Sequence, residues 1–137
     1  MLKKIEHVHV ACAILFRENH LFAAKRGANQ RLSGYWEFPG GKIKYQESPS
    51  ACVVRELKEE LDMDVLPEEC LDVVVHQYED LKVSLYPIRC TLQSNAYKLK
   101  EHSEAGWFSW EQVAKLSWAP ADILIIKKLL DGMEDLK

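Results

Sequence analysis

The sequence predicts an α/β domain, because strand-like and helix-like segments are interspersed along the chain. Four segments rich in β-branched and aliphatic residues are predicted strands, at 5–16, 21–26, 71–78 and 82–92. Three segments carry helix-start signals, at 48–61, 109–114 and 123–130. Mixed strands with two or three helices are typical of layered α/β domains around one hydrophobic core.

Length and composition indicate one domain, spanning residues 1–137. The 137 residues are 47% hydrophobic and 28% charged, which suits a single globular core. A net charge of −3 gives no basic surface for a nucleic acid polymer or an anionic membrane. We therefore expect a small charged ligand, bound locally with the help of a metal.

Two features of the chain favour a cytoplasmic location. No apolar run approaches the roughly 20 residues that a membrane-spanning helix needs, and Glu6 interrupts the apolar stretch near the N-terminus, unlike a secretory signal. The four cysteines lack Cys-x-x-Cys spacing, so we predict reduced, buried thiols rather than a zinc site or disulfides. They are Cys12, Cys52, Cys70 and Cys90.

The first half of the chain begins with a predicted hairpin, in which residues 17–20 form the polar turn. His7 and His9 share one face of its first strand, where they either bind a metal or simply pack or lie exposed. Residues 27–35 are a polar, glycine-containing loop that could border a substrate pocket. A short strand at 36–41 then closes in a turn at two glycines.

The second half is predicted to contain another hairpin, 71–78 with 82–92, after a loop at 62–70 that includes Pro67. Pro87 suggests that the last of these strands is an edge strand or is bulged. A polar loop at 93–103 leads to a short strand, Trp107–Phe108. Ser109 and Gln112 form a predicted capping box for a small helix, and the helix at 123–130 should stop near Gly132.

The helix at 48–61 is the most informative segment. Ser48 is a predicted N-cap, and Pro49 suits the first helical position. On a helical projection, the predicted core face carries Ala51, Val54, Leu57 and Leu61. The opposite face carries Glu56, Glu59 and Glu60.

These three glutamates are unfavourably placed for an ordinary solvated face. Glu56 faces Glu59 and Glu60 at i+3 and i+4, and each such like-charge pair costs roughly 0.2–0.5 kcal/mol. The helix ends near Leu61, so the carboxylates also lie at the negative end of its dipole. A cluster of this kind indicates a cation site, and its oxygen ligands suit Mg²⁺ or Mn²⁺.

The spacing of these residues resembles the motif of the Nudix family. Gly41 is followed after five residues by Glu47, and after seven more by Arg55-Glu56-Leu57-Lys58-Glu59-Glu60. The family pattern ends in a glycine, where this chain has Asp62. That residue follows the helix and would have to enter the left-handed region, which Asp enters more readily than most residues. The resemblance implies an α/β/α sandwich around a mixed β-sheet.

The resemblance also implies roles for residues in and near the motif. The metal ligands would be Glu56, Glu59, Glu60 and the Gly40 carbonyl. Arg55 could orient a carboxylate or be an ordinary exposed arginine, and Glu47 could bind metal directly, hold its loop or hold a water beside the metal. The general base remains open between a glutamate of the motif and Glu101, which would then also bind metal. Glu104 competes with Glu101 for this place.

Outside the motif, the chain resembles the MutT-like branch of the family, which acts on nucleoside triphosphates. By that resemblance Arg26, Phe38 and Gly41 would line the nucleotide site, and Asp122 would reach the base. A carboxylate there accepts hydrogen bonds from cytosine or from guanine, so the base stays open. The alternative for Asp122 is the N-cap of the last helix.

The sequence therefore predicts a Mg²⁺-dependent pyrophosphohydrolase that converts a nucleoside triphosphate, such as CTP or an oxidised dNTP, to the monophosphate and pyrophosphate. Other Nudix substrates, such as a nucleotide sugar or a dinucleotide, are an alternative. A nucleotide sensor without activity is a third, disfavoured because a sensor could bind without such costly charges. We expect a monomer or a homodimer.

Overall fold

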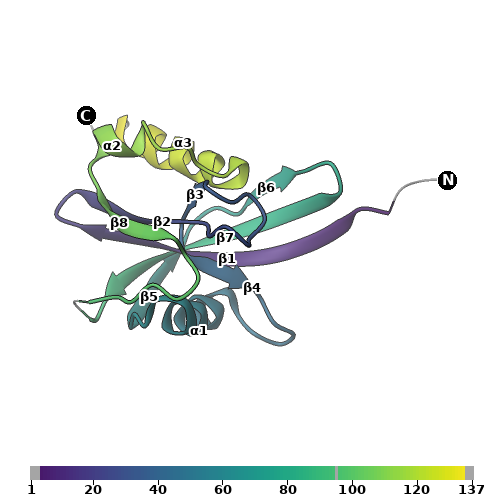
Figure 1. The fold of residues 1–137 in the computed structure, drawn as a ribbon, viewed down its shortest axis with the longest axis horizontal. Helices are drawn as coiled ribbons and strands as arrows, with labels where there is room; N and C mark the ends of the chain where they lie inside the picture. The colour runs from purple at the N-terminus through teal and green to yellow at the C-terminus, as the bar shows by residue number, and fades with distance from the viewer. Residues whose placement is uncertain (1–3, 95, 135–137) are drawn as a thin grey trace.

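Two long parallel strands form the centre of the fold. β1 (Glu6–Arg17) pairs with β7 (Leu81–Leu92) from Glu6 opposite Leu81 to Leu15 opposite Cys90. The structure is a computed structural model that describes residues 4–94 and 96–134. The rest of the described chain is arranged on the two edges and two faces of this pair (Figure 1).

The other strands extend this pair into a mixed sheet. On the β1 side, β2 pairs antiparallel with β1, β3 and β8, while β4 pairs antiparallel with another part of β1. On the other side, β5 and β6 pair antiparallel with β7. These strands are β2 (His20–Lys25), β3 (Trp36–Glu37), β4 (Gly40–Lys42), β5 (Val65–Cys70), β6 (Val74–Gln77) and β8 (Glu104–Phe108).

Helices cover both faces of the sheet. α1 (Pro49–Leu61) lies on one face, and α2 (Trp110–Val113) and α3 (Pro120–Glu134) lie on the other (Figure 1). Alternation along β1 builds both cores, because Cys12 and Ile14 pack on the α3 side while Ala13 and Leu15 pack on the α1 side. The predicted α/β/α sandwich is confirmed.

Both predicted hairpins are present. β1 and β2 are joined by Glu18 and Asn19, whose φ angles of 48° and 67° fit the turn that a two-residue hairpin favours. β6 and β7 form the second hairpin, although β6 begins only at Val74. The predicted loop at 93–103 is observed in its described residues, and the strand after it begins at Glu104, earlier than predicted.

The prediction of a loop at 62–70 is wrong from Val65 onward. Residues Val65–Cys70 form β5, and the register of its pairing with β7 shifts between Pro67 and Glu69. Proline is tolerated at such an irregularity of an edge strand. The pairing with β7 therefore outweighs the loop-like local composition of this segment.

The prediction for Pro87 is also wrong, because β7 is an interior strand of the sheet and the register irregularity lies in β5. The Pro87 carbonyl accepts a hydrogen bond from the Leu71 N–H at 2.9 Å, so Pro87 faces the connection between β5 and β6. Its nitrogen points to the same side, since both backbone groups of a strand residue do. The N–H that Pro87 lacks would therefore point toward the connection between β5 and β6 and not toward a paired strand.

The ends of α1 are confirmed, but its predicted core face is not. Ser48 Oγ accepts from the Ala51 N–H, and Asp62 adopts the left-handed conformation with φ 53°. The buried residues are Cys52, Val53, Leu57 and Leu61, whereas Ala51 and Val54 are exposed. The helix is therefore rotated so that its Cys52–Glu56–Glu60 row also faces the protein.

α3 begins at Pro120 rather than Ile123, so Asp122 lies inside its first turn and is not its N-cap. The capping box of Ser109 and Gln112 is confirmed. Three cysteines are buried as predicted, but Cys70 is exposed. Among the described residues, no helix is long and apolar enough to cross a membrane.

The left-handed conformation of Asp62 generates a stability prediction. Asp62→Ala should lower the free energy of unfolding by roughly 1 kcal/mol, because alanine enters this conformation less readily than aspartate. Asp64→Ala is the matched control, since Asp62 and Asp64 pair with the same Lys58 at 3.2 and 3.3 Å and are similarly exposed. Urea unfolding should separate the two variants. Equal losses would show that the shared ion pair, not the backbone, matters.

Candidate active site

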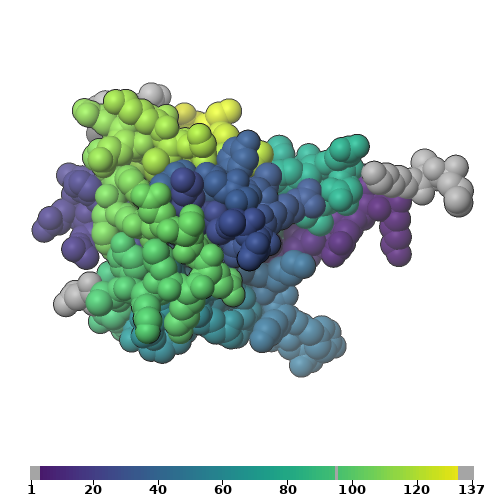
Figure 2. Space-filling model, in the orientation of Figure 1, coloured from purple at the N-terminus to yellow at the C-terminus, as the bar shows by residue number. Residues whose placement is uncertain are grey.

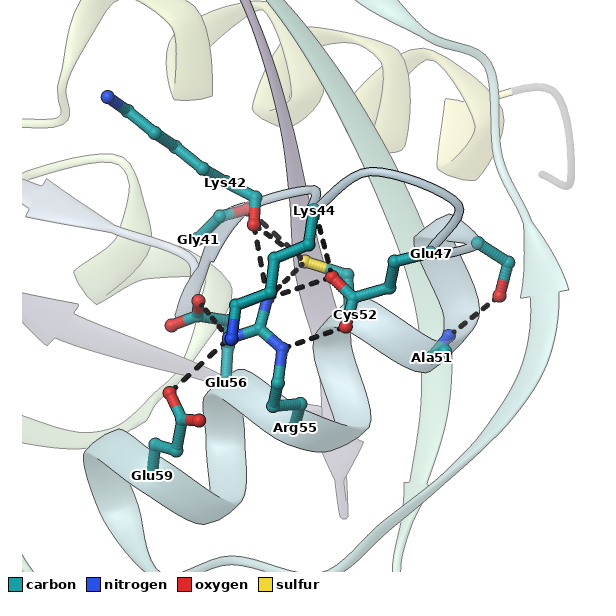
Figure 3. Close-up of polar contacts among 10 residues, drawn as sticks. Gly41, Lys42, Lys44, Glu47, Ala51, Cys52, Arg55, Glu56 and Glu59 are labelled. Carbon is teal, nitrogen blue, oxygen red and sulfur yellow. Dashed lines mark hydrogen bonds and ion pairs between the residues drawn. The ribbon is translucent and has the colours of Figure 1, made fainter.

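The Arg55 guanidinium is the centre of a cluster of carboxylates on α1 and on the loop before it (Figure 3). Its Nε and Nη2 donate to the two oxygens of Glu47 at 2.7 and 2.8 Å. Its Nη1 donates to Glu56 at 2.7 Å and to Glu59 at 3.3 Å. Arg55 is thus not an ordinary exposed arginine, because it binds three glutamates from the motif.

Glu47 fastens the loop before α1. The Lys44 N–H donates to Glu47 at 3.0 Å, and Arg55 Nη2 also donates to the Lys42 carbonyl at 3.1 Å. Hydrogen bonds from Arg55 lower the pKa of Glu47 to about 2, with a further contribution from the Lys44 N–H. The structure therefore places Glu47 where it holds the loop through Arg55.

The two glycines of β4 allow the sheet and α1 to approach each other. A Cβ on Gly41 would lie 2.3 Å from the Glu56 carboxyl carbon, and one on Gly40 would lie 1.9 Å from the Ala11 carbonyl oxygen. Gly40 has no room for a side chain against the backbone of β1, and a side chain at Gly41 would require the Glu56 carboxyl to move. Glu56 is thereby held directly against the backbone of β4.

Glu60 is the most deeply buried glutamate of α1. Burial raises its pKa to about 9, with further contributions from the hydrogen-bonded Glu56 carboxyl and from the charges of Glu37 and Glu101. Its Oε2 atom is buried and has no hydrogen-bond partner within the described residues. A buried oxygen of this kind indicates a position that a cation or a bound water would satisfy.

Two functional candidates, Glu37 and His102, were missed by the sequence analysis. His102 Nε2 lies 2.9 Å from Glu37 Oε2 and 3.9 Å from Glu60 Oε2. Arg26 Nη1 donates to the other oxygen of Glu37 at 2.5 Å. The charge of Glu37 between Trp36 and Phe38 was a usable signal, whereas His102 lies in a polar loop that carries no signal for a buried imidazole.

A cavity of about 510 Å³ lies beside these groups. Its lining includes six residues predicted for the site, namely Arg26, Phe38, Gly40, Gly41, Glu60 and Asp122. Loop residues of 27–35 also line it, as expected for a loop that borders a pocket. The volume is within the range of small-molecule sites.

Asp122 joins α3 to Phe38, which lies between β3 and β4. The predicted turn at the two glycines is wrong, because Gly40 and Gly41 pair with β1 as part of β4. The Asp122 Oδ2 atom accepts a hydrogen bond from the Phe38 N–H at 2.9 Å. Burial, and secondarily the charge of Glu37, raises the pKa of Asp122 well above its ordinary value. Asp122 therefore lines the cavity, and one of its oxygens is already hydrogen-bonded to the Phe38 backbone.

The remaining predicted residues lie at the edge of the site. Glu59 is 57% exposed and pairs with Arg55 at 3.3 Å. Glu101 is exposed and outside the cavity lining, but its charge contributes to the raised pKa of Glu60. Glu104 lies on β8 opposite Lys25 and pairs with it at 4.0 Å. Of Glu101 and Glu104, Glu101 is the one whose charge contributes to the raised pKa of Glu60.

The donor set fits a divalent cation. The carboxylates of Glu37, Glu60 and Asp122 line the cavity, and Glu60 Oε2 has no hydrogen-bond partner in the described residues. Arg55 holds Glu56 and Glu59, and no three histidine, cysteine or acidic side chains of the described residues already surround a metal position. A bound cation would therefore compete with Arg55 for these carboxylates.

His7 and His9 have other partners. His7 Nε2 hydrogen-bonds to Ser84 Oγ at 2.7 Å, and His9 Nδ1 hydrogen-bonds to the Tyr86 hydroxyl at 2.8 Å. Both histidines are exposed on the strand pair β1–β7 and neither lines the cavity. Ordinary surface contacts account for them.

Comparison with known proteins agrees with this geometry. A model of the NUDIX domain matches residues 6–129. The 8-oxo-dGTP diphosphatase of Proteus vulgaris is 37% identical over 79 residues, which are 57% of this chain and 70% of that protein. The CTP pyrophosphohydrolase of Escherichia coli (strain K12) is 28% identical over 123 residues, covering 90% of this chain and 91% of that protein.

A solved structure extends the similarity to the fold. The solution structure of MutT from methicillin-resistant Staphylococcus aureus 252 is 32% identical, with a TM-score of 0.74, and the match covers 94% of this chain and 99% of that one. The chain therefore belongs to the Nudix hydrolase family.

Proposed function

We propose that this protein is a Mg²⁺-dependent pyrophosphohydrolase, with Mn²⁺ as a substitute, that converts a nucleoside triphosphate to the monophosphate and pyrophosphate. The observation that carries the proposal is the position of Glu60, buried beside Glu56 at the end of a cavity that Arg26, Phe38 and Asp122 also line. Relatives named as a CTP pyrophosphohydrolase and an 8-oxo-dGTP diphosphatase support it.

The carboxylates of α1 would hold the metal. We assign this role to Glu56, Glu59 and Glu60, together with the Gly40 carbonyl. A bound divalent cation neutralises phosphate charge and supports attack by water on the phosphoanhydride bond. Arg55 would keep the carboxylates oriented, and Glu47 would hold Arg55 in turn, as their two short hydrogen bonds indicate.

The general base is a glutamate, either of α1 or of the loop after β7. Glu101 is the loop candidate, and it would also complete the metal site. Its exposure and its electrostatic influence on Glu60 suit a group that approaches the site when substrate binds. Glu59 and Glu60 are the candidates on α1.

The cavity would bind the nucleotide between β3, β4 and the start of α3. Gly41 allows phosphates to approach the backbone, and Phe38 and Arg26 would contact the nucleoside. Asp122 would bind the base with the oxygen that the Phe38 N–H leaves free. This geometry is compatible with CTP and with an oxidised dNTP.

The rival functions differ in what they need from the site. A nucleotide sugar or a dinucleotide would use the same metal site with a different group in the cavity. A nucleotide sensor would bind without turnover, but it would not need Glu60 buried next to Glu56. A cytoplasmic location and a monomeric or homodimeric state remain predictions from the sequence.

A nucleotide screen tests the function directly. With Mg²⁺ present, we expect pyrophosphate to be released from CTP, 8-oxo-dGTP or both, and activity should disappear with EDTA and return with added Mg²⁺. Pyrophosphate and phosphate must be detected separately. Release of phosphate alone would overturn the assigned bond, and binding without turnover would favour the sensor.

Glu59→Gln tests the assigned site. We expect kcat to fall about 100-fold or more, because a ligand charge is lost while the exposed side chain keeps its shape. Thermal stability in metal-free buffer should stay the same or rise slightly, since a like-charge interaction with Glu56 is removed. Glu111→Gln, an exposed glutamate on α2, is the control. Full activity of the Glu59 variant would refute its place in the site.

A further inference from the structure

His102 is a buried residue between exposed neighbours in the loop that precedes β8. Its side chain is only 1% exposed, whereas Glu101 and Ser103 on either side of it are exposed. A polar side chain is buried at this depth only when its contacts offset the loss of water. The contacts of His102 are with carboxylates on two other elements, Glu37 of β3 and Glu60 of α1.

The Glu37 carboxylate ties His102 to the sheet. One of its oxygens lies 2.9 Å from His102 Nε2, and the other accepts from Arg26 Nη1 at 2.5 Å. Arg26 Nε also donates to the Arg31 carbonyl. Arg26 and His102 therefore each bind one oxygen of Glu37, and the Glu37 carboxylate that accepts from the imidazole is held in place by Arg26.

The backbone of the loop is held close to the same place. The Ser103 N–H donates to the Lys25 carbonyl at 3.0 Å, and a Cβ on Gly27 would lie 2.5 Å from the Glu101 carbonyl oxygen. Figure 2 shows this loop, in green, lying against the dark blue segment that follows β2. Glu101 thus lies between a close backbone contact at Gly27 and a buried side chain at His102.

We propose that His102 is a positioning residue that, through its hydrogen bond to Glu37, holds Glu101 beside the metal-binding end of the cavity. The proposal rests on the proposed function, because it takes Glu101 as the acidic group that the loop supplies. His102 itself would not touch the reacting atoms. It would act by fixing the position of the Glu101 backbone, from which the exposed side chain extends.

Two substitutions separate the hydrogen bond from the packing. His102→Gln keeps an N–H donor at about the position of Nε2, whereas His102→Met keeps a similar length without any donor. With Mg²⁺ and the better of CTP and 8-oxo-dGTP, His102→Met should lower kcat about 10- to 100-fold, and KM should change less than kcat. His102→Gln should restore most of the activity. Equal activity of the two variants would overturn the proposal.

A double-mutant cycle shows whether His102 acts through Glu101. Glu101→Gln should itself lower kcat, and adding His102→Met to it should cost little more, because the group being positioned is already gone. Independent losses that multiply would overturn the proposal. A harmless Glu101→Gln would overturn it too, without touching the pyrophosphohydrolase assignment, which depends on the Glu59 variant and on wild-type turnover.

Hydrogen exchange gives a readout that does not depend on activity. In metal-free protein, the Ser103 amide should exchange faster in His102→Met than in wild type, and His102→Gln should resemble wild type. Unchanged exchange in His102→Met would contradict the tether even if the enzyme proved to be inactive on every nucleotide. If His102→Met fails to fold, His102→Asn replaces it, because its amide is one methylene too short to reach Glu37.

Discussion

The guanidinium of Arg55 allows several carboxylates to gather at one end of a helix and one edge of a sheet. It binds both oxygens of Glu47 and also contacts Glu56 and Glu59, so one cation offsets repulsion among three anions. The same guanidinium reaches the Lys42 carbonyl and so joins the loop before α1 to the helix itself. Without it, the helix end would combine like charges with an unfavourable dipole. Arg55 therefore offsets the repulsion that gathering these carboxylates would otherwise cause.

Much of this arrangement was predictable because it depends on local spacing. Ser48 and Pro49 start the helix, the glutamate spacing identifies the acidic face, and the left-handed Asp62 ends the helix despite the departure from the family pattern. The parts that were wrong depend on long-range pairing. β5 forms because β7 offers an unpaired edge, and Pro87 is accommodated because its nitrogen faces a change of neighbours. Neither condition is visible in a local window of sequence.

Within the site, too, the residues predicted correctly depend on local sequence and the missed ones on contacts distant in sequence. Arg26, Phe38, Gly40, Gly41, Glu60 and Asp122 were predicted from motif and resemblance, and the fold brings them to one cavity. Glu37 was missed although its charge between two aromatic residues was a usable signal, whereas His102 gains its role only when its loop meets Glu37 of β3. The projection of α1 also chose the wrong core side, since Val54 is exposed and the row Cys52–Glu56–Glu60 faces inward. Helical periodicity constrains which residues share a face, but the neighbouring elements decide which face is buried.

The buried polar groups explain how the site combines rigidity with adaptability. Glu37, Glu60 and His102 are costly to bury, and Glu60 and His102 each keep one buried atom without a partner in the described residues. Such costs are tolerated where an active site needs fixed groups. Glu59 and Glu101, by contrast, remain exposed and can move toward a metal–nucleotide complex. Glu37 and Glu60 line the cavity, whereas Glu59 and Glu101 lie outside its lining. On the proposed function, the metal site would therefore be completed only when substrate arrives, and the cavity around Phe38 and Asp122 would be formed beforehand.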